Sequence, residues 1–390
     1  MTSAERLVAS LNHKEPDRVP YDLAGTTVTG ISRKAFIRAM EYRGISTEFE
    51  RKEVDPIQQI VTPSEETLKF LKSDTRRIGA RRIPDYEKIV KVNDGIWELT
   101  DIWGCTWRMD ENKDYYFNQY TYPMEQYTSI DEGLKHWKTP DLSIHADLIR
   151  SDLAEQTARI QNYGVIADRN CAGLTETSLR VRGYESWYLD TMTDPAGVEK
   201  LFDVITDYKL RYWDLVIDWL IEHNLQDRVN VFSECDDLGT QTSTLLDPDY
   251  LRKAVIPRFG YIWNSIKRRV PGAKIFMHTC GSVRVLLPDL IEAGLDIYNP
   301  VQFTAANMEL AGLKKDFGKD LVFWGGGVNT QSTLKNASPD KVSDEVKRIL
   351  DIMSPGGGFV FTPVHNIQED VPPENFWAMW DTLMEYGKYS

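Results

Sequence analysis

The chain has 390 residues, with 46 Lys plus Arg against 59 Asp plus Glu, so its formal net charge is −13. An acidic surface repels phosphate backbones and anionic headgroups, which argues against nucleic acid and membranes as partners, and against a polyanionic substrate unless arginines gather locally. The longest apolar runs are too short to cross a bilayer, and the charged N-terminal stretch is unlike a signal peptide, so we expect a cytoplasmic protein.

The N-terminal half contains fewer regular elements than the C-terminal half. We expect a short helix that ends in a turn at Pro16, a strand at 18–25 (RVPYDLAG), a strand at 163–170 (YGVIADRN) and a further strand between these two. Residues 95–124 are aromatic, β-branched and interrupted by turn residues, which predicts antiparallel hairpins inserted into the fold. Their aromatic side chains could form a hairpin core or a lid over an apolar ligand: Trp97, Trp103, Trp107, Tyr115, Tyr116 and Phe117.

Strands and helices alternate regularly in the C-terminal half. A long helix is expected at 194–224, and five strands follow, at 229–234, 273–278, 296–301, 321–326 and 358–363. Helical stretches come after them, at 247–270, 282–294, 308–317, 338–353 and 372–387. Such repeats imply a parallel sheet, and the strand count approaches eight. Because no G-x-G-x-x-G fingerprint is present, we expect a (β/α)8 barrel that spans residues 1–390 as a single domain, instead of an open doubly wound sheet.

Polar and metal-binding side chains follow each of these five strands. In a parallel barrel the carboxyl ends of the strands form the site, so these residues are expected to share one rim. Each residue alone has a simpler explanation, for example a turn cap or a buried core histidine, but together they predict a site. The residues are Glu234, Cys235, Asp236, Asp237, His278, Cys280, Asn299, Gln302, Asn329, His365 and Asn366.

The pair His278 and Cys280 is the most specific of these features. Side chains alternate along an extended strand, so the two point to the same side. Imidazole nitrogen and thiolate sulfur suit Zn²⁺. The alternative is that both are packed core residues, as free cysteines often are.

Several stretches resemble the uroporphyrinogen decarboxylase superfamily, over essentially the whole chain. They include AERLVASLNHKEPDRVPYDLAG, MHTCGSVRVLLPDLIEAGLDIYNPVQ and GGGFVFTPVHNIQEDVPPENFWAM. The resemblance is closer to the branch of corrinoid-dependent zinc methyltransferases, including O-demethylase components, and it implies a (β/α)8 barrel. In that branch an H-x-C pair and a distant downstream cysteine bind zinc. No cysteine follows Cys280 here, so His365 is the expected third ligand after His278 and Cys280, with Glu234, Cys235 and Asp236 as reserves.

The resemblance implies methyl transfer between a small methylated substrate and the cobalt of a separate corrinoid (cobalamin) protein that docks transiently at the rim. We favour transfer from a methyl donor, with an aryl methyl ether as the expected substrate, to Co(I), with zinc as Lewis acid. The residues expected to position the substrate or supply a proton are Asp236, Asp237 and Glu234. The residues expected to contact the substrate are Asp22, Asn299, Gln302 and Asn329.

Four alternatives remain open at this point. The protein could transfer a methyl group from methylcorrinoid to coenzyme M or a similar thiol, or use a bound metal for hydrolysis. It could also be a metal-free barrel that binds a small ligand. A decarboxylase acting on uroporphyrinogen is disfavoured, because the stretch after the first strand has no arginine before Arg33. A homodimer is compatible with any of these.

Overall fold

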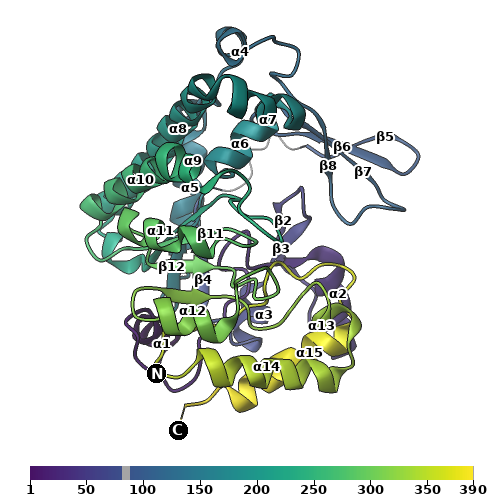
Figure 1. The fold of residues 1–390 in the computed structure, drawn as a ribbon. Helices are drawn as coiled ribbons and strands as arrows, with labels where there is room; N and C mark the ends of the chain where they lie inside the picture. Colours follow the sequence, from purple (N-terminus) through teal and green to yellow (C-terminus); the bar gives the residue numbers. More distant parts are fainter. Residues whose placement is uncertain (81–87, 390) are drawn as a thin grey trace.

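The computed structural model describes residues 1–80 and 88–389, apart from the side chains of residues 51–53. Its main feature is a seven-stranded parallel sheet in the order β14-β13-β12-β11-β10-β9-β4, with helices around it (Figure 1). The strands are β4 (Thr75–Ile78), β9 (Gly164–Ala167), β10 (Val231–Cys235), β11 (Lys274–His278), β12 (Ile297–Asn299), β13 (Val322–Trp324) and β14 (Phe359–Val360). β4 is the strand expected between the first two, and the α/β barrel class is confirmed.

Residues 19–23 join the two edges of this sheet. On one side Asp22 N–H donates to the carbonyl of Phe361 at 2.9 Å, and Phe361 N–H donates to the carbonyl of Pro20 at 2.8 Å. On the other side Asp74 N–H, next to β4, donates to the carbonyl of Tyr21 at 2.8 Å. The expected strand at 18–25 therefore lies in the eighth position, but it forms only isolated bridges, a parallel one from Tyr21 to Phe361 and an antiparallel one from Arg18 to Lys388. Pro20 cannot donate to a ladder, which keeps the pairing short.

Most of the helices cover the outside of the sheet. They are α1 (Ser3–Leu11), α5 (Leu142–Thr157), α6 (Leu174–Arg182), α7 (Tyr184–Thr193), α8 (Pro195–Glu222), α10 (Ile256–Arg269), α11 (Leu287–Ala293), α12 (Leu310–Phe317), α14 (Pro339–Met353) and α15 (Pro373–Tyr386). The expected helix at 247–270 is instead divided into α9 (Pro248–Tyr250), a π-helical turn at Leu251–Val255 and α10. Pro257 lacks the N–H that would continue regular α-helical bonding at this point.

Two smaller antiparallel sheets lie outside the barrel sheet. Residues 90–121 form β5 (Val90–Asn93), β6 (Ile96–Thr100), β7 (Thr106–Asp110) and β8 (Asn118–Thr121), paired in that order. They project from the body of the molecule beyond α7 in Figure 1. The other sheet contains β1 (Ile31–Ser32), β3 (Ile60–Pro63) and β2 (Phe49–Asp55). The remaining α-helices are α2 (Arg33–Tyr42), α3 (Glu65–Phe70), α4 (Ile130–His136) and α13 (Thr333–Asn336).

Apolar side chains fill the inside of the barrel. Alternate residues of the parallel strands form one buried cluster with Leu7 and Leu11 of α1: Ile166, Val231, Phe276, Ile297, Val322, Trp324 and Val360. The residues between them point outward and pack against the helices, as the period of two requires. The barrel is therefore a packed core rather than a channel. In the described ranges, no helix is long and apolar enough to span a bilayer.

Candidate functional site

Three metal-ligand side chains meet at the carboxyl end of the parallel sheet. His278 is the last residue of β11, Cys280 follows it by two residues, and His365 lies in the loop after β14. One ligand atom from each lies within 4.8 Å of the other two. The Cys280 Sγ lies 3.6 Å from His278 Nε2, and the two imidazole rings are 5.3 Å apart between centroids. We call these three residues the ligand triad.

Asn299 sets the tautomer of His278. Its Nδ2 donates to the carbonyl of Trp324 at 2.8 Å, which turns its Oδ1 toward His278 Nδ1 at 2.6 Å. Since an amide oxygen only accepts, Nδ1 must carry the proton. The lone pair of Nε2 is then free on the side that faces Cys280, which is the arrangement that a metal-binding histidine needs.

The geometry of the triad fits a zinc ion. Zn–N of about 2.1 Å and Zn–S of about 2.3 Å at a tetrahedral angle separate the two ligand atoms by about 3.6 Å. The distance between Nε2 and Sγ is 3.6 Å. Two nitrogens and one sulfur also leave a fourth position open, as in catalytic zinc sites.

The protonation states of the triad are also compatible with a bound zinc ion. Burial lowers the pKa of His278 well below its usual value and that of His365 to about 4, so both rings are neutral at pH 7. Burial raises the pKa of the Cys280 thiol, and the nearby Asp237 carboxylate adds to this. A divalent cation would supply the positive charge that converts this thiol to a thiolate ligand.

The loop that carries Cys280 depends on a glycine and a glutamine. Gly281 has a φ of +85°, and a Cβ there would lie 2.5 Å from the carbonyl oxygen of Thr240. Its N–H donates to Gln302 Oε1 at 2.7 Å. Gln302 therefore holds the ligand loop in place through the backbone.

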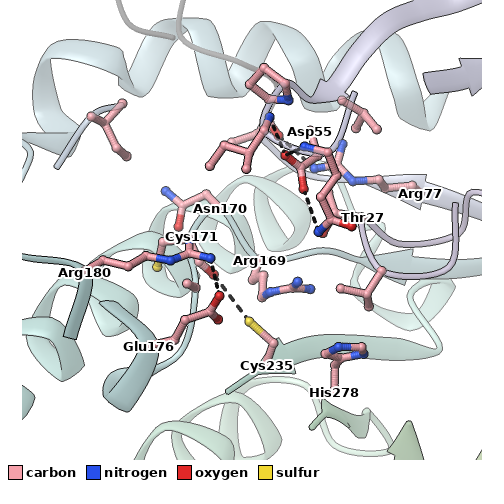
Figure 2. Close-up of a pocket in the computed structure, with 18 of the residues that line it drawn as sticks. Thr27, Asp55, Arg77, Arg169, Asn170, Cys171, Glu176, Arg180, Cys235 and His278 are labelled. Atoms are coloured by element: carbon pink, nitrogen blue, oxygen red, sulfur yellow. Dashed lines mark hydrogen bonds and ion pairs between the residues drawn. The ribbon is translucent and has the colours of Figure 1, made fainter. Parts of the chain in front are cut away.

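A cavity of about 220 Å³ opens beside the triad and is lined by His278 and His365 (Figure 2). Its charged wall comes from β2, β4, α6 and the segments after β9 and β10. The charged side chains in the wall are Asp55, Arg77, Arg169, Glu176, Arg180 and Asp237.

Of the three carboxylates expected to act on the substrate, Asp237 is the one in the cavity wall. Glu234 is fully buried, 2.7 Å from Lys209 Nζ, and accepts from Trp213 Nε1 at 2.6 Å. Asp236 is also buried and accepts from the backbone N–H groups of Thr175 and Glu176 at 2.8 and 2.9 Å. Since Gly173, the N-cap of α6, has no side chain, Asp236 caps this helix from a neighbouring loop.

Asp237 contributes to the cavity wall and is itself exposed to solvent. Partial desolvation at this wall raises the pKa of its carboxyl to about 7, and the negative charges of Glu176 and Asp236 contribute to the same shift. Solvent at an exposed site screens these charges, so the acid form of Asp237 is enriched at neutral pH relative to an ordinary surface aspartate.

The four residues expected to contact substrate lie behind the cavity wall. Asp22 is buried and accepts from Trp324 Nε1 at 2.8 Å, while Asn329 Oδ1 accepts from Gln331 N–H at 2.8 Å. Asn299 and Gln302 hold the triad, as described above. The structure thus gives all four residues hydrogen-bonding roles within the protein.

Sequence reasoning missed three arginines that the fold brings to the cavity. They are Arg77 from β4, Arg169 just after β9 and Arg180 from α6. Arg77 Nε donates to Asp168 Oδ2 at 2.7 Å, and Arg180 is paired with Glu176. Asp168 and Arg169 lie near the end of the strand predicted at 163–170 and just after the observed β9, so the strand-end pattern used for the C-terminal half could have found them.

The aromatic residues of the inserted segment do not line the cavity. Trp103 packs edge-on against Tyr208 with centroids 4.8 Å apart, and Trp107 Nε1 donates to Asp101 at 2.9 Å. Phe117 is buried, whereas Tyr115 and Tyr116 are exposed on the surface. Of the two alternatives for these side chains, hairpin core and lid, the packing of the large buried rings agrees with hairpin core.

Three comparisons place this architecture among known proteins. A model of the uroporphyrinogen decarboxylase (URO-D) family matches residues 104–386. A uroporphyrinogen decarboxylase from Actinobacillus succinogenes is 29% identical over 199 residues, and this match spans 50% of the chain and only 50% of that relative's length. A methyltransferase structure from Methanosarcina mazei shares the fold, with a TM-score of 0.63 at 16% identity over 99% of both chains. The chain belongs to the uroporphyrinogen decarboxylase (URO-D) family.

Proposed function

We propose that this protein is a zinc-dependent methyltransferase that moves a methyl group from a small methyl ether to the Co(I) of a separate corrinoid protein. The observation that carries the proposal is the ligand triad, with three ligand atoms within 4.8 Å at the mouth of a cavity. The shared fold with a methyltransferase supports the same reading. His278, Cys280 and His365 would hold the zinc.

The reaction breaks the bond between the methyl carbon and the ether oxygen. Co(I) supplies the electron pair of the new cobalt–carbon bond, and the oxygen leaves with the pair of the broken bond. The leaving oxygen then needs a proton, because an alkoxide or phenoxide is a poor leaving group. When bound, zinc would supply Lewis-acid charge to stabilise that oxygen.

The residues of the chain supply position and the proton. Asp237 lies in the cavity wall and can hold a proton at neutral pH, so we assign it as the acid that protonates the leaving oxygen. Asn299 keeps the imidazole of His278 oriented. We place the docking site of the corrinoid protein at the open rim above the cavity, and the enzyme in the cytoplasm.

The cavity favours this function over decarboxylation of a tetrapyrrole. Its volume of about 220 Å³ is below the range of about 300–1,000 Å³ that is typical for drug-sized ligands. The wall also balances its arginines with the carboxylates Asp55, Glu176 and Asp237. An octa-anion would meet these carboxylates, so we expect a smaller substrate. Because the wall in the described ranges has no Phe, Tyr or Trp, the ether need not be aromatic.

Zinc content and methyl transfer test the proposal together. We expect about one zinc per chain in the wild type and little or none in His278→Ala, Cys280→Ala and His365→Ala. The same variants should lose methylation of cob(I)alamin by small methyl ethers, followed by the visible spectrum of methylcobalamin. Cys105→Ala, which removes a buried cysteine of the inserted segment, is the matched control and should retain both properties.

Two results would count against the proposal. The first is a wild-type protein that takes up no zinc even after supplementation. The second is normal methyl transfer in the three triad variants. Zinc uptake with methylation of a thiol by methylcobalamin, and no ether demethylation, would instead favour the thiol methyltransferase alternative.

A further inference from the structure

Arg169 has unused hydrogen-bonding capacity inside the cavity. Its side chain is only 9% exposed, and Nη1 makes two long contacts of 3.3 Å, to Asp168 Oδ1 and Ser233 Oγ. Within the described part of the chain, Nε and Nη2 have no hydrogen-bond partner. A guanidinium carries five donors. Nε and Nη2 are not sealed from solvent, so both donors are open to the cavity.

The other two arginines of the cavity already have partners within the protein. Arg77 donates from Nε to Asp168 and from Nη2 to the carbonyl of Ala80 at 3.0 Å. Arg180 is paired with Glu176 on its own helix. Asp168 therefore neutralises only one of its two arginine neighbours, Arg77 and Arg169. The cavity wall also carries the carboxylates Asp55 and Asp237, so Arg169 is distinguished by its free donors and not by a net positive charge.

Arg169 lies close to the ligand triad. Figure 2 shows its side chain in the middle of the cavity, near Cys235 and His278. Arg169, His278 and His365 line the same cavity. The free donors of Arg169 thus share the cavity with the place where the methyl group would react.

We propose that the Nε–Nη2 edge of Arg169 binds a carboxylate on the methyl donor, so that the substrate is a small carboxylic acid bearing the transferable methyl group. Two parallel N–H donors on one planar edge match the two oxygens of a carboxylate. The bound carboxylate would accept a hydrogen bond from each of these two free donors. This inference rests on the proposed function for the fate of the methyl group, but the anion site itself requires neither metal nor corrinoid.

Binding of matched acids and amides tests the site directly. The probes are methoxyacetate with methoxyacetamide, and benzoate with benzamide, measured by isothermal titration calorimetry on the full chain. Hydrogen bonds to a charged group are strong, so we expect each acid to bind at least about tenfold more tightly than its amide. The comparison is repeated after zinc is removed with a chelator, because a carboxylate could also bind the metal.

Variants then assign the preference to one residue. Arg169→Met should abolish the preference for the acid, and Arg169→Lys should retain part of it because a single charge remains without the planar edge. Arg211→Met removes an arginine of α8 that is half exposed and paired with Asp207 at 3.0 Å, and it should behave as wild type. Thermal melting of each variant checks that it is folded.

The outcomes separate this inference from the proposed function. A preference for acids that persists without zinc and disappears in Arg169→Met supports the carboxylate site, even if no corrinoid activity is found. Equal binding of acid and amide in the wild type overturns it, and so does an unchanged preference in Arg169→Met. If the preference is lost when zinc is removed, the carboxylate binds the metal and the assignment to Arg169 is wrong. The wild-type comparison remains decisive if the methionine variant does not fold.

Discussion

At the scale of single residues, the orientation of His278 depends on an amide that does not itself touch the cavity. Asn299 contacts Trp324 with one end and His278 with the other. Residues that orient metal-binding histidines typically change metal affinity or activity by about 10–100-fold when mutated. We therefore expect Asn299→Ala to weaken zinc binding by about 10–100-fold, measured by competition with a chromogenic chelator.

Asn329→Ala provides the matched control for this prediction. Asn329 also follows a strand of the sheet, but its side chain bonds to the backbone of its own loop. Its removal should leave zinc affinity unchanged. Equal zinc affinity in Asn299→Ala and wild type would show that His278 is oriented by other contacts.

At the scale of elements, a buried ion pair joins helix α8 to strand β10. Lys209 Nζ and Glu234 Oε2 are 2.7 Å apart, and the two side chains are 1% and 0% exposed. Removing one partner leaves a buried charge without compensation. We expect Lys209→Met to lower the free energy of unfolding by about 3–5 kcal/mol, measured by denaturant titration.

The double variant Lys209→Met with Glu234→Gln distinguishes a structural pair from a catalytic carboxylate. Glutamine removes the negative charge and can still accept from Trp213 Nε1. The double variant should therefore be more stable than Lys209→Met alone and should retain methyl transfer. If the two changes lower the free energy of unfolding additively, the two residues are not coupled. If the double variant folds but is inactive, Glu234 has a role in the reaction.

At the scale of the whole molecule, a network of charges holds residues 19–23, the segment that closes the barrel, against the rest of the sheet. Arg6 lies 2.7 Å from Asp17 and 2.7 Å from Asp74, and Arg18 lies 2.7 Å from Asp74. The hydrogen bond from Arg6 is the main reason that the pKa of Asp17 falls to about 2. These contacts link α1, the closing segment and the start of β4.

The lowered pKa of Asp17 gives its contribution to stability a defined pH range. A carboxyl with a lowered pKa in the folded state stabilises the protein above its unfolded pKa of about 4, and this is lost as the pH falls toward 2. Because Asp17 is 45% exposed, we expect Asp17→Asn to cost no more than about 1 kcal/mol at pH 7. The unfolding free energies of variant and wild type, measured from pH 7 downward, should start to converge as the pH falls below about 4. A gap that stays constant to pH 3 would contradict the assignment.

The sequence allowed the barrel to be predicted, but only part of the site. Alternating apolar strands and helices are local patterns, and the pair His278 and Cys280 lies in one short stretch, so both are readable along the chain. The arginines of the cavity come from separate elements, and nothing local brings them together. Glu234 has its partner on α8 and Asp236 has its partner on α6. These contacts could not be predicted for the same reason. A strand-end carboxylate looks the same in the sequence whether it faces a substrate, a lysine or a helix terminus.

The closure of the barrel by residues 19–23 also affects the order of folding during synthesis. This segment leaves the ribosome long before its partner Phe361, and Ser10 likewise waits for Phe359, 349 residues away. Until then, one edge of the growing sheet has no neighbour to accept its backbone hydrogen bonds. Contacts this distant in sequence slow folding and leave apolar surface exposed to other nascent chains. The contact that completes the barrel thus also forms late in synthesis. We expect a chaperone to bind the exposed apolar surface mainly before this contact forms.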